Sequence, residues 1–508
     1  MKNNLLRGLF FLIFISFFSE ISAQTDEQIV TNLDFYIQKA IVDWQTPGLA
    51  VAVVKDGKII LSKGYGVREL GKSERVNGQT IFACASTTKA MTALALGILV
   101  DEGKLNWTDK VVQHLPDFKV NDPFITNELT VQDLLTHNSG MGNADYLWGW
   151  TDLTSADILK KFQLAKPAYS LRGGYTYQNI MYLVAGEVVA KLSGVTWEAF
   201  IQKRIFDPLS MKHTFPTFKQ SLVEKNRSTP HDFIKQKLSI IENCPADAIA
   251  PAGAAWSCAD DMAKWLQFWL DSTKINAKPL VKATTLTELW RPHALVPQSD
   301  FYPTASLIKP NWTSYALGWF QHDYRGEKVN FHTGSLDGTV AICGLIPSEN
   351  IGVYVFGNRD HTELRHAIMY RVFDIFLNKK AGKTSELRDW SADFKTLYDG
   401  FKVQTDSTNA RKEQKRIVGT TPSVSLEKYV GKYTDPLIGD AVVSLKDGKL
   451  SVQFTSQLSA TLEHWHYDTF KATYNKGWFS PDFLSFNLDE LGTPRELKSG
   501  TSVWKRLL

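Results

Sequence analysis

The segment Phe82–Asp101 constrains the fold more than any other part of the chain. The run from Ala90 to Val100 is so consistently apolar that a helix over it has no polar face. A helix that is apolar all round lies buried in the core of a protein. The sequence therefore predicts a central buried helix with the other elements packed around it, and Ser86 and Lys89 stand at its start.

Ser86 and Lys89 have the spacing of an activated nucleophile. If the helix begins at Ser86, the two side chains lie one turn apart on the same face. The hydroxyl then sits at a helix N-terminus, where N–H groups and the dipole favour negative charge. An amine in partly dry surroundings has a lowered pKa and can take the hydroxyl proton. A serine that merely caps a core helix gives the same pattern, and Ser-x-x-Lys occurs four times in the chain.

The periodicity on both sides of this helix predicts an α+β fold. A helix over Asp26–Trp44 precedes a hairpin joined at Lys55-Asp56-Gly57, and a long helical middle section follows. We expect one antiparallel sheet made from both chain ends and covered by helices. The later elements expected are strands over 315–322, 328–332, 339–346 and 351–356, and a helix over 364–377.

The two ends of the chain differ from this central part. Residues 1–23 have the charged start, apolar run and small-residue cleavage site of a secretory signal peptide, so we expect a secreted or periplasmic protein. We expect the main domain over 24–380 and a helix and linker over 381–423, the linker from Val403 to Ser423. Residues 424–508 have the alternating strands and Gly turns of a small antiparallel β-barrel.

Composition excludes several classes of function. A net charge of +4 in 508 residues argues against a nucleic-acid partner. No segment after the signal is typical of a transmembrane helix, so we expect no stable membrane insertion. Four cysteines do not make a disulfide scaffold, and a bridge between Cys244 and Cys258 stays open, as does the oligomeric state.

Two further motifs supply partners for Ser86. Tyr177-Gln178-Asn179 is the only Tyr-x-Asn and follows a Gly-rich loop, and His332-Thr333-Gly334 ends a predicted strand. A phenolic oxygen near Lys89 can act as general base, because a nearby cation favours the phenolate. A Gly at a strand edge lets substrate approach closely, and N–H groups there can complete an oxyanion hole. No metal-binding or phosphate-binding motif is present, so no metal or cofactor is expected.

These three motifs, in this order, resemble those of serine β-lactamases and penicillin-binding proteins. The Tyr-x-Asn form is similar to the branch of class C β-lactamases, D-Ala-D-Ala carboxypeptidases, D-aminopeptidases and related esterases. The resemblance implies that fold, with Ser86 as nucleophile, Lys89 as its proton partner and Tyr177 as general base and then acid. It places Asn179 on the substrate amide, and Thr333, Gly334 and Ser335 along the substrate-binding strand edge.

One position departs from the class C pattern. His332 stands where class C β-lactamases carry Lys, whereas related D-peptidases carry His, and its carboxylate-binding role would depend on pH. Each residue also has a purely structural interpretation: Tyr177 as loop packing, Asn179 as a helix cap, His332 as a strand-end cap. His137 in Leu134–Met141 is expected to bond loop carbonyls, and Asp337 before Gly338 is typical of a turn.

The sequence predicts an exported serine hydrolase that forms an acyl-enzyme on a small-molecule or peptide substrate. A D-peptidase, either carboxypeptidase or aminopeptidase, is the main hypothesis. An esterase or a weak class C-like β-lactamase on the same site is the alternative, and a catalytically inactive binding protein is the alternative from another class.

Overall fold

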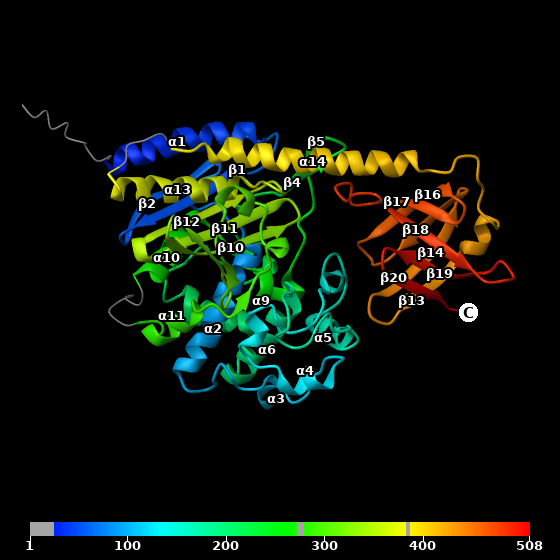
Figure 1. The fold of residues 1–508 in the computed structure, drawn as a ribbon, viewed down its shortest axis with the longest axis horizontal. Coiled ribbons are helices and arrows are strands. Elements are labelled where there is room, and N and C mark those ends of the chain that lie inside the picture. The colour runs from blue at the N-terminus through cyan, green and yellow to red at the C-terminus, as the bar shows by residue number, and fades with distance from the viewer. Residues whose placement is uncertain (1–24, 272–278, 383–386, 508) are drawn as a thin grey trace, which may run out of the picture.

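The computed structural model describes residues 25–271, 279–382 and 387–507. The predicted signal peptide lies outside the described residues. Figure 1 shows a large mixed helix-and-sheet body joined by one long helix to a smaller all-β body, which carries the C-terminus. The α+β prediction with a C-terminal barrel is confirmed.

The large body is built on an eight-stranded antiparallel sheet in the order β2-β1-β12-β11-β10-β9-β8-β7. Strand β1 from the N-terminal hairpin pairs with β12, so both chain ends form the sheet, as predicted. The strands are β1 (Gly48–Lys55), β2 (Lys58–Gly66), β7 (Ala294–Leu295), β8 (Thr313–Tyr315), β9 (Phe320–Tyr324), β10 (Glu327–Leu336), β11 (Thr339–Ile346) and β12 (Ile351–Gly357).

The strand expected over 315–322 is wrong, because the chain breaks between β8 and β9. Gly318 there has a φ of +83°, and a Cβ on it would stand 3.0 Å from the carbonyl oxygen of Lys89. A side chain at this position would meet the backbone of the central helix. The break therefore lets the sheet approach the start of that helix closely.

Helices cover both faces of the sheet (Figure 1). Helices α1 (Asp26–Asp43) and α13 (Leu364–Lys380) pack on one face, and α10 (Ala259–Leu270) packs on the other. On the same side of the sheet as α10 lies the helical middle of the chain, centred on α2 (Lys89–Asp101) and α6 (Asn179–Ser193). Its shorter helices are α3 (Val111–His114), α4 (Pro123–Glu128), α5 (Ser155–Phe162), α7 (Trp197–Ile201), α8 (Phe218–Ser221), α9 (Ala250–Gly253), α11 (Ala283–Leu289) and α12 (Ala305–Ile308).

The central helix begins later than expected. A 3₁₀ turn, η1 (Ala85–Thr88), carries Ser86, and the α-helix starts only at Lys89. Every residue of α2 except Val100 and Asp101 is buried, which confirms the core helix predicted from the apolar run. Two short ladders flank this region, β3 (Phe82–Ala83) with β6 (Trp256–Ser257) and β4 (His231–Ile234) with β5 (Lys237–Ile240).

Helix α14 (Trp390–Gln414) connects the two bodies. The linker expected from Val403 is wrong over its first half, because the helix continues to Gln414. Trp390 and Phe394 pack into the sheet-side core, whereas the residues from Asp399 to Gln414 are exposed or half-buried on every side. A helix polar all round is typical of a solvent-bridging connection between domains.

The small body is a closed barrel of eight antiparallel strands. Its interior is filled by its own side chains, among them Tyr429, Tyr433, Phe470, Phe486 and Trp504. The strands are β13 (Gly431–Asp435), β14 (Gly439–Lys446), β15 (Lys449–Gln453), β16 (Ser459–His466), β17 (Thr469–Tyr474), β18 (Asp482–Leu488), β19 (Pro494–Ser499) and β20 (Ser502–Arg506).

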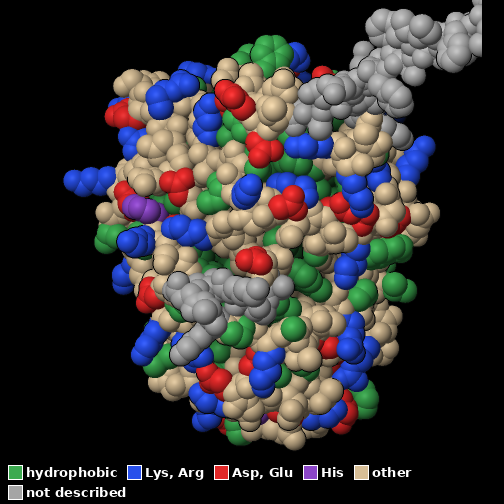
Figure 2. All heavy atoms as spheres, turned by 90° about the vertical axis from the view of Figure 1, so that its left-hand side faces the viewer, with side chains coloured by type: hydrophobic (Ala, Val, Ile, Leu, Met, Phe, Trp, Pro, Cys, Tyr) green, Lys and Arg blue, Asp and Glu red, His purple; other side chains and the backbone are tan. Residues whose placement is uncertain are grey.

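The surface and the cysteines carry few special features. On the face shown in Figure 2, positive and negative side chains are interspersed. All four cysteines, Cys244 and Cys258 included, are buried free thiols. Of the described helices, none is by itself long and apolar enough to cross a membrane; the bent pair Asn179–Ser193 and Trp197–Phe206 meets the test by length and composition only.

Candidate active site

Ser86 and Lys89 meet at the junction of η1 and α2. The Lys89 ammonium donates to Ser86 Oγ at 3.1 Å, to Asn179 Oδ1 at 2.7 Å and to the carbonyl oxygen of Ala252 at 2.9 Å. Ala85, just before Ser86, has a φ of +46°, a conformation that non-glycine residues rarely adopt. The backbone thus turns sharply at the serine and holds its hydroxyl against the lysine.

The surroundings of Lys89 favour its neutral form. Lys89 is fully buried, and burial lowers its pKa to about 7, with the Asp145 carboxylate acting in the opposite direction. The Tyr177 and Tyr182 rings lie 4.8 and 5.2 Å from its nitrogen. Near neutral pH the amine can therefore exchange a proton with Ser86.

Tyr177 lies beside both groups, but as a neutral phenol. Burial raises its pKa well above the ordinary value, and contact with the Ser86 hydroxyl only partly offsets this rise. Its ring packs against the tilted His137 ring with the centroids 4.2 Å apart, and His137 Nδ1 accepts the Gln178 N–H at 3.0 Å. His137 thus bonds a backbone N–H rather than the loop carbonyls expected for it, and it fixes the loop that carries Tyr177.

Asn179 joins Lys89 to an acidic residue that the sequence analysis missed. Asn179 opens α6, its Oδ1 accepts from Lys89, and its Nδ2 donates to Asp145 Oδ1 at 2.9 Å. Asp145 also accepts from the Trp148 indole at 2.8 Å and from Asn143 at 3.0 Å. The amide expected to touch substrate is thereby held in a fixed orientation.

The end of β10 forms the opposite wall. A Cβ on Gly334 would stand 2.3 Å from the carbonyl oxygen of Cys84 and 2.9 Å from the Ser86 nitrogen, so the strand reaches Ser86 only because this residue is glycine. The Thr333 hydroxyl bonds the Tyr302 hydroxyl, and Ser335 Oγ accepts from Arg365 at 2.9 Å. The strand edge therefore lies directly beside Ser86.

His332 is near the site but does not line the cavity. It is fully buried, its Nδ1–H donates to the Thr333 carbonyl at 2.6 Å, and its Nε2 accepts from the Tyr315 hydroxyl at 2.8 Å. Burial, with Lys89 nearby, lowers its pKa to about 3. The neutral imidazole of His332 packs against Tyr177 and Phe320 and offers no positive charge to a substrate carboxylate.

Arg365 supplies the cation that His332 does not, and the sequence analysis missed it. It lies in the first turn of α13 and donates to the Gly334 carbonyl at 2.5 Å and to Ser335 Oγ. Glu363 pairs with it at 3.0 Å; although burial alone raises the pKa of Glu363, Arg365 and His366 hold it well below its usual range. No local signal distinguishes Arg365 in the sequence, because the same helix carries other polar side chains, among them His366, Arg371 and Asp374.

One cavity of about 420 Å³ unites these groups. Among its described lining residues Arg365 is the only cationic side chain, opposite Asp145 and Asp300. The predicted residues that line it are Ser86, Tyr177, Asn179, Thr333 and Ser335. Within the described parts of the chain no group of three or more His, Cys, Asp or Glu side chains is placed to hold a metal ion.

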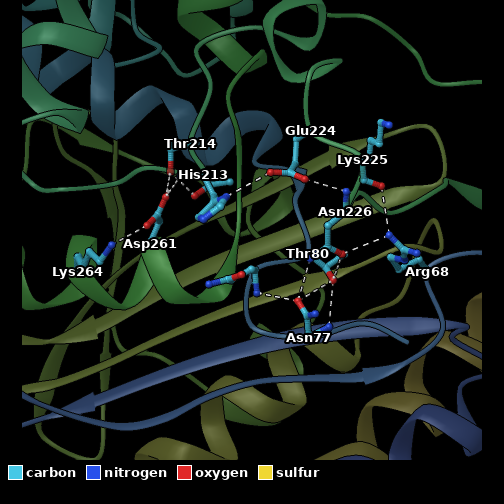
Figure 3. Close-up of polar contacts among 12 residues, drawn as sticks. Arg68, Asn77, Thr80, His213, Thr214, Glu224, Lys225, Asn226, Asp261 and Lys264 are labelled. Atoms are coloured by element: carbon cyan, nitrogen blue, oxygen red, sulfur yellow. Dashed lines mark hydrogen bonds and ion pairs between the residues drawn. The ribbon is translucent and has the colours of Figure 1, made fainter. Parts of the chain in front are cut away.

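A polar network beside α10 fixes the short strand that leads to Ser86. Asn226 accepts from Thr80 at 2.8 Å and donates to Asn77 at 3.0 Å, and its carbonyl accepts the Ile81 N–H at 2.9 Å (Figure 3). Next to it, Asp261 of α10 accepts from Thr214 and pairs with Lys264 (Figure 3). Strand β3 is thus held immediately before the η1 turn.

Comparison with known families agrees with this geometry. Residues 33–374 match the Beta-lactamase family, which covers well over half of the chain. The chain belongs to the Beta-lactamase family. Residues 415–502 match a domain of unknown function, DUF3471, over the barrel. Together with the site, this membership identifies a serine hydrolase.

Several relatives of the family extend over most of the chain. An unguisins hydrolase of Aspergillus violaceofuscus is 27% identical over 507 residues, 91% of this chain and 86% of the relative. Protein flp of Staphylococcus aureus is 29% identical over 66% of this chain and 63% of its own length. The octameric penicillin-binding protein homologue of Pyrococcus abyssi shares the fold, with a TM-score of 0.59, 21% identity and coverage of 94% and 99%.

Proposed function

We propose that this serine hydrolase is an exported peptidase that cleaves D-amino-acid peptides through an acyl-enzyme on Ser86. One observation carries the proposal: a fully buried lysine with a pKa of about 7 contacts the Ser86 hydroxyl in a cavity that also contains Tyr177. Such a lysine is costly to bury, and depressed lysine pKa values are typical of sites that move protons.

The three contacts of Lys89 define the path of the proton. Asn179 Oδ1 and the Ala252 carbonyl can only accept hydrogen bonds, and they lie closer to the amine than Ser86 Oγ does. When Lys89 is neutral, its two N–H groups serve these two acceptors. The lone pair is then directed at Ser86 Oγ, where it takes the hydroxyl proton as Oγ attacks the substrate carbonyl carbon.

Tyr177 completes the exchange. Because burial keeps it protonated, it can donate its phenolic proton to the leaving amine as the C–N bond breaks, and Lys89 can return a proton to it. The acyl group stays on Ser86 Oγ until water, activated along the same path in reverse, hydrolyses the ester. This assigns the base role to Lys89 and the acid role to Tyr177, a refinement of the general-base role expected for the tyrosine.

The polar lining of the cavity supports a substrate carboxylate. Thr333 and Ser335 provide hydroxyl groups along the strand edge on the β10 side of Ser86, and the Arg365 guanidinium lies beside them, paired with Glu363. The planar fork of Arg365 engages Glu363 through Nε and Nη2, so toward a substrate carboxylate Arg365 acts by positioning Ser335, to which its Nη1 donates. This arrangement favours a carboxypeptidase over an aminopeptidase.

Mass spectrometry of the intact protein tests the nucleophile. We expect a fluorophosphonate and a penicillin each to add one mass increment that Ser86→Ala abolishes. Labelling by the penicillin supports a D-peptidase over an esterase. If neither reagent labels the wild-type protein, the chain is not an acyl-enzyme hydrolase and the binding-protein alternative replaces the proposal.

Two matched comparisons test the substrate. We expect a D-Ala-D-Ala peptide with a free carboxylate to be cleaved faster than its C-terminal amide, and faster than its L,L isomer. Equal rates on all three would remove the D-carboxypeptidase assignment.

The N-terminus of the mature protein tests export. In protein recovered from an expressing bacterium it should be Gln24, and an intact Met1 would contradict export.

A further inference from the structure

The β-barrel is fastened to the loop that carries Asp145, and this fastening reaches Lys89. Three rim loops of the barrel contact the large body, at 436–437, 455–457 and 476–478. Two of them hold the segment between Asp145 and Asp152. We call this segment the Asp145–Asp152 loop.

A single carboxylate connects three parts of the chain. Asp337 Oδ2, in the turn that follows β10, accepts the indole N–H of Trp150 at 2.8 Å and that of Trp478 at 2.9 Å. Trp150 belongs to the Asp145–Asp152 loop, and Trp478 belongs to the barrel. Asp337 stands two residues after Ser335, so the barrel is tied at once to the loop and to the substrate-binding strand edge.

The other contacts hold the same loop. Thr455 donates to the Trp150 carbonyl at 2.7 Å, and Ser456 donates from its N–H and its hydroxyl to Asp152 at 2.8 and 2.5 Å. The Lys476 ammonium lies 4.0 Å from the centre of the Trp150 ring. Trp150 has a φ of +55°, a strained conformation that persists only where neighbours enforce it. Here the barrel supplies those neighbours.

From this loop an unbroken hydrogen-bond path leads to the nucleophile. The Trp148 indole donates to Asp145, Asn179 donates to Asp145, and Lys89 donates to Asn179. Beside Lys89, Tyr177 and Tyr182 are kept neutral by burial, and burial also keeps His137 and His332 neutral near pH 7. Asp145 is therefore the charged neighbour that stabilises the lysine ammonium.

We propose that Asp145 is a positioning residue whose placement depends on the docked barrel, so that the barrel sets the proton affinity of the nucleophile's base. The inference rests on the proposed function, because it assigns Lys89 as the base. The barrel then acts on catalysis through Trp478, Asp337, the Asp145–Asp152 loop and Asn179, without entering the cavity itself.

The pH dependence of Ser86 acylation tests this proposal. Asp145→Asn keeps the oxygen that accepts from Asn179 and Trp148 but removes the charge, so the ascending limb of the fluorophosphonate labelling rate should move to lower pH by about half a unit. Trp478→Phe keeps the ring but removes the N–H that bonds Asp337. We expect it to move the limb in the same direction by a smaller amount and to slow labelling about threefold.

Trp504→Phe is the matched control. Trp504 is a buried barrel tryptophan whose indole N–H has no partner among the described residues, so the substitution removes an N–H that bonds nothing. We expect an unchanged pH limb. If Asp145→Asn moves the limb but Trp478→Phe and Asp337→Asn both leave it in place, the barrel does not act on Lys89 and the proposal is overturned.

A second measurement does not depend on activity. In a double-mutant cycle for unfolding, Trp478→Phe and Asp145→Asn should be non-additive, because the two residues are joined through one loop, whereas Trp504→Phe and Asp145→Asn should be additive. Additivity in both cycles overturns the coupling even if wild-type labelling is absent. Absence of labelling together with a non-additive first cycle removes the proposed function but supports the coupling.

Discussion

The catalytic cavity and the barrel interior are two aromatic-rich enclosures that differ in what fills them. In the barrel, Tyr429, Phe470 and Phe486 pack against one another around the barrel axis. In the cavity, Tyr177, Tyr302 and Phe320 form walls around open space into which Ser86 and Arg365 also face. The packed barrel interior contributes to stability, whereas the open cavity has room for a substrate. The barrel can therefore affect catalysis only through its rim.

The largest change in turnover is expected when one buried side chain is substituted in the cavity and, as a comparison, one in the barrel interior. Lys89→Met should lower turnover about 10³-fold, because it removes the group that we propose as general base. It should also raise the melting temperature, and more so at pH 6 than at pH 9. The folded-state pKa of Lys89 is lowered to about 7, so the cost of its buried charge is fully present below pH 7 and fades as pH rises toward the unfolded value.

Phe470→Leu is the counterpart in the barrel. Phe470 is 1% exposed, and the smaller side chain should lower stability by about 1 to 2 kcal/mol while turnover stays unchanged. Thermal unfolding and kcat/KM measured on both variants check the contrast. If Lys89→Met lowered stability as much as Phe470→Leu does, the predicted difference between the cavity and the barrel interior would be contradicted.

Gly334→Ala tests how tightly the cavity wall is placed. The added methyl group would meet the backbone of Cys84 and Ser86, and the resulting shift of β10 should cost about 100-fold in kcat/KM. Gly400→Ala is the control, since a Cβ there meets nothing within 4 Å and the site is in α14. It should stabilise the protein by about 1 kcal/mol and leave kcat/KM unchanged.

The pH profile of the wild-type enzyme is the next largest effect. Because only neutral Lys89 can accept the Ser86 proton and its pKa is lowered to about 7, kcat/KM should rise roughly tenfold between pH 6 and 8. The pKa of Tyr177 is raised well above 10, so no second limb from its ionisation should appear in this interval. A profile that falls across the interval would assign the base to a different group.

The smallest effect is expected at the rim. Ser456→Ala removes the hydroxyl that bonds Asp152 but keeps the Ser456 N–H bond to the same carboxylate. We expect a loss of about 0.5 to 1 kcal/mol in unfolding free energy and a change in kcat/KM of less than about twofold. A change in kcat/KM larger than that of Trp478→Phe would show that the Ser456 hydroxyl contributes more to the coupling than the Trp478 indole does.

Much of the fold and the motif residues could be predicted from the sequence because they depend on local pattern. The apolar run after Lys89 defines a core helix, and the alternation around Lys55-Asp56-Gly57 defines a hairpin, whatever surrounds them. The continuation of α14 to Gln414 could not be predicted, because residues such as Thr405, Ser407 and Asn409 form no apolar stripe.

The remaining site residues depend on tertiary neighbours. His332 was expected to meet substrate, but Tyr315 and Thr333 engage both its nitrogens behind the strand. Asp337 was interpreted as a turn residue, and the indoles that bond it come from residues 187 positions before and 141 positions after it. No local pattern reports such pairings, so the cation at the cavity and the link to the barrel emerge only from the folded chain.

The rigid span of α14 has a kinetic consequence. Its 25 residues extend over about 37 Å, with Trp390 and Phe394 packed in the large body and Glu413 bonded to Lys471 of the barrel, so the helix holds the barrel near its docking surface. Rebinding after a transient opening is therefore intramolecular, and it is favoured because the connection already spans the distance between the docked domains. We therefore expect the rim hydrogen bonds to keep these two domains docked with less binding free energy than two separate proteins would need.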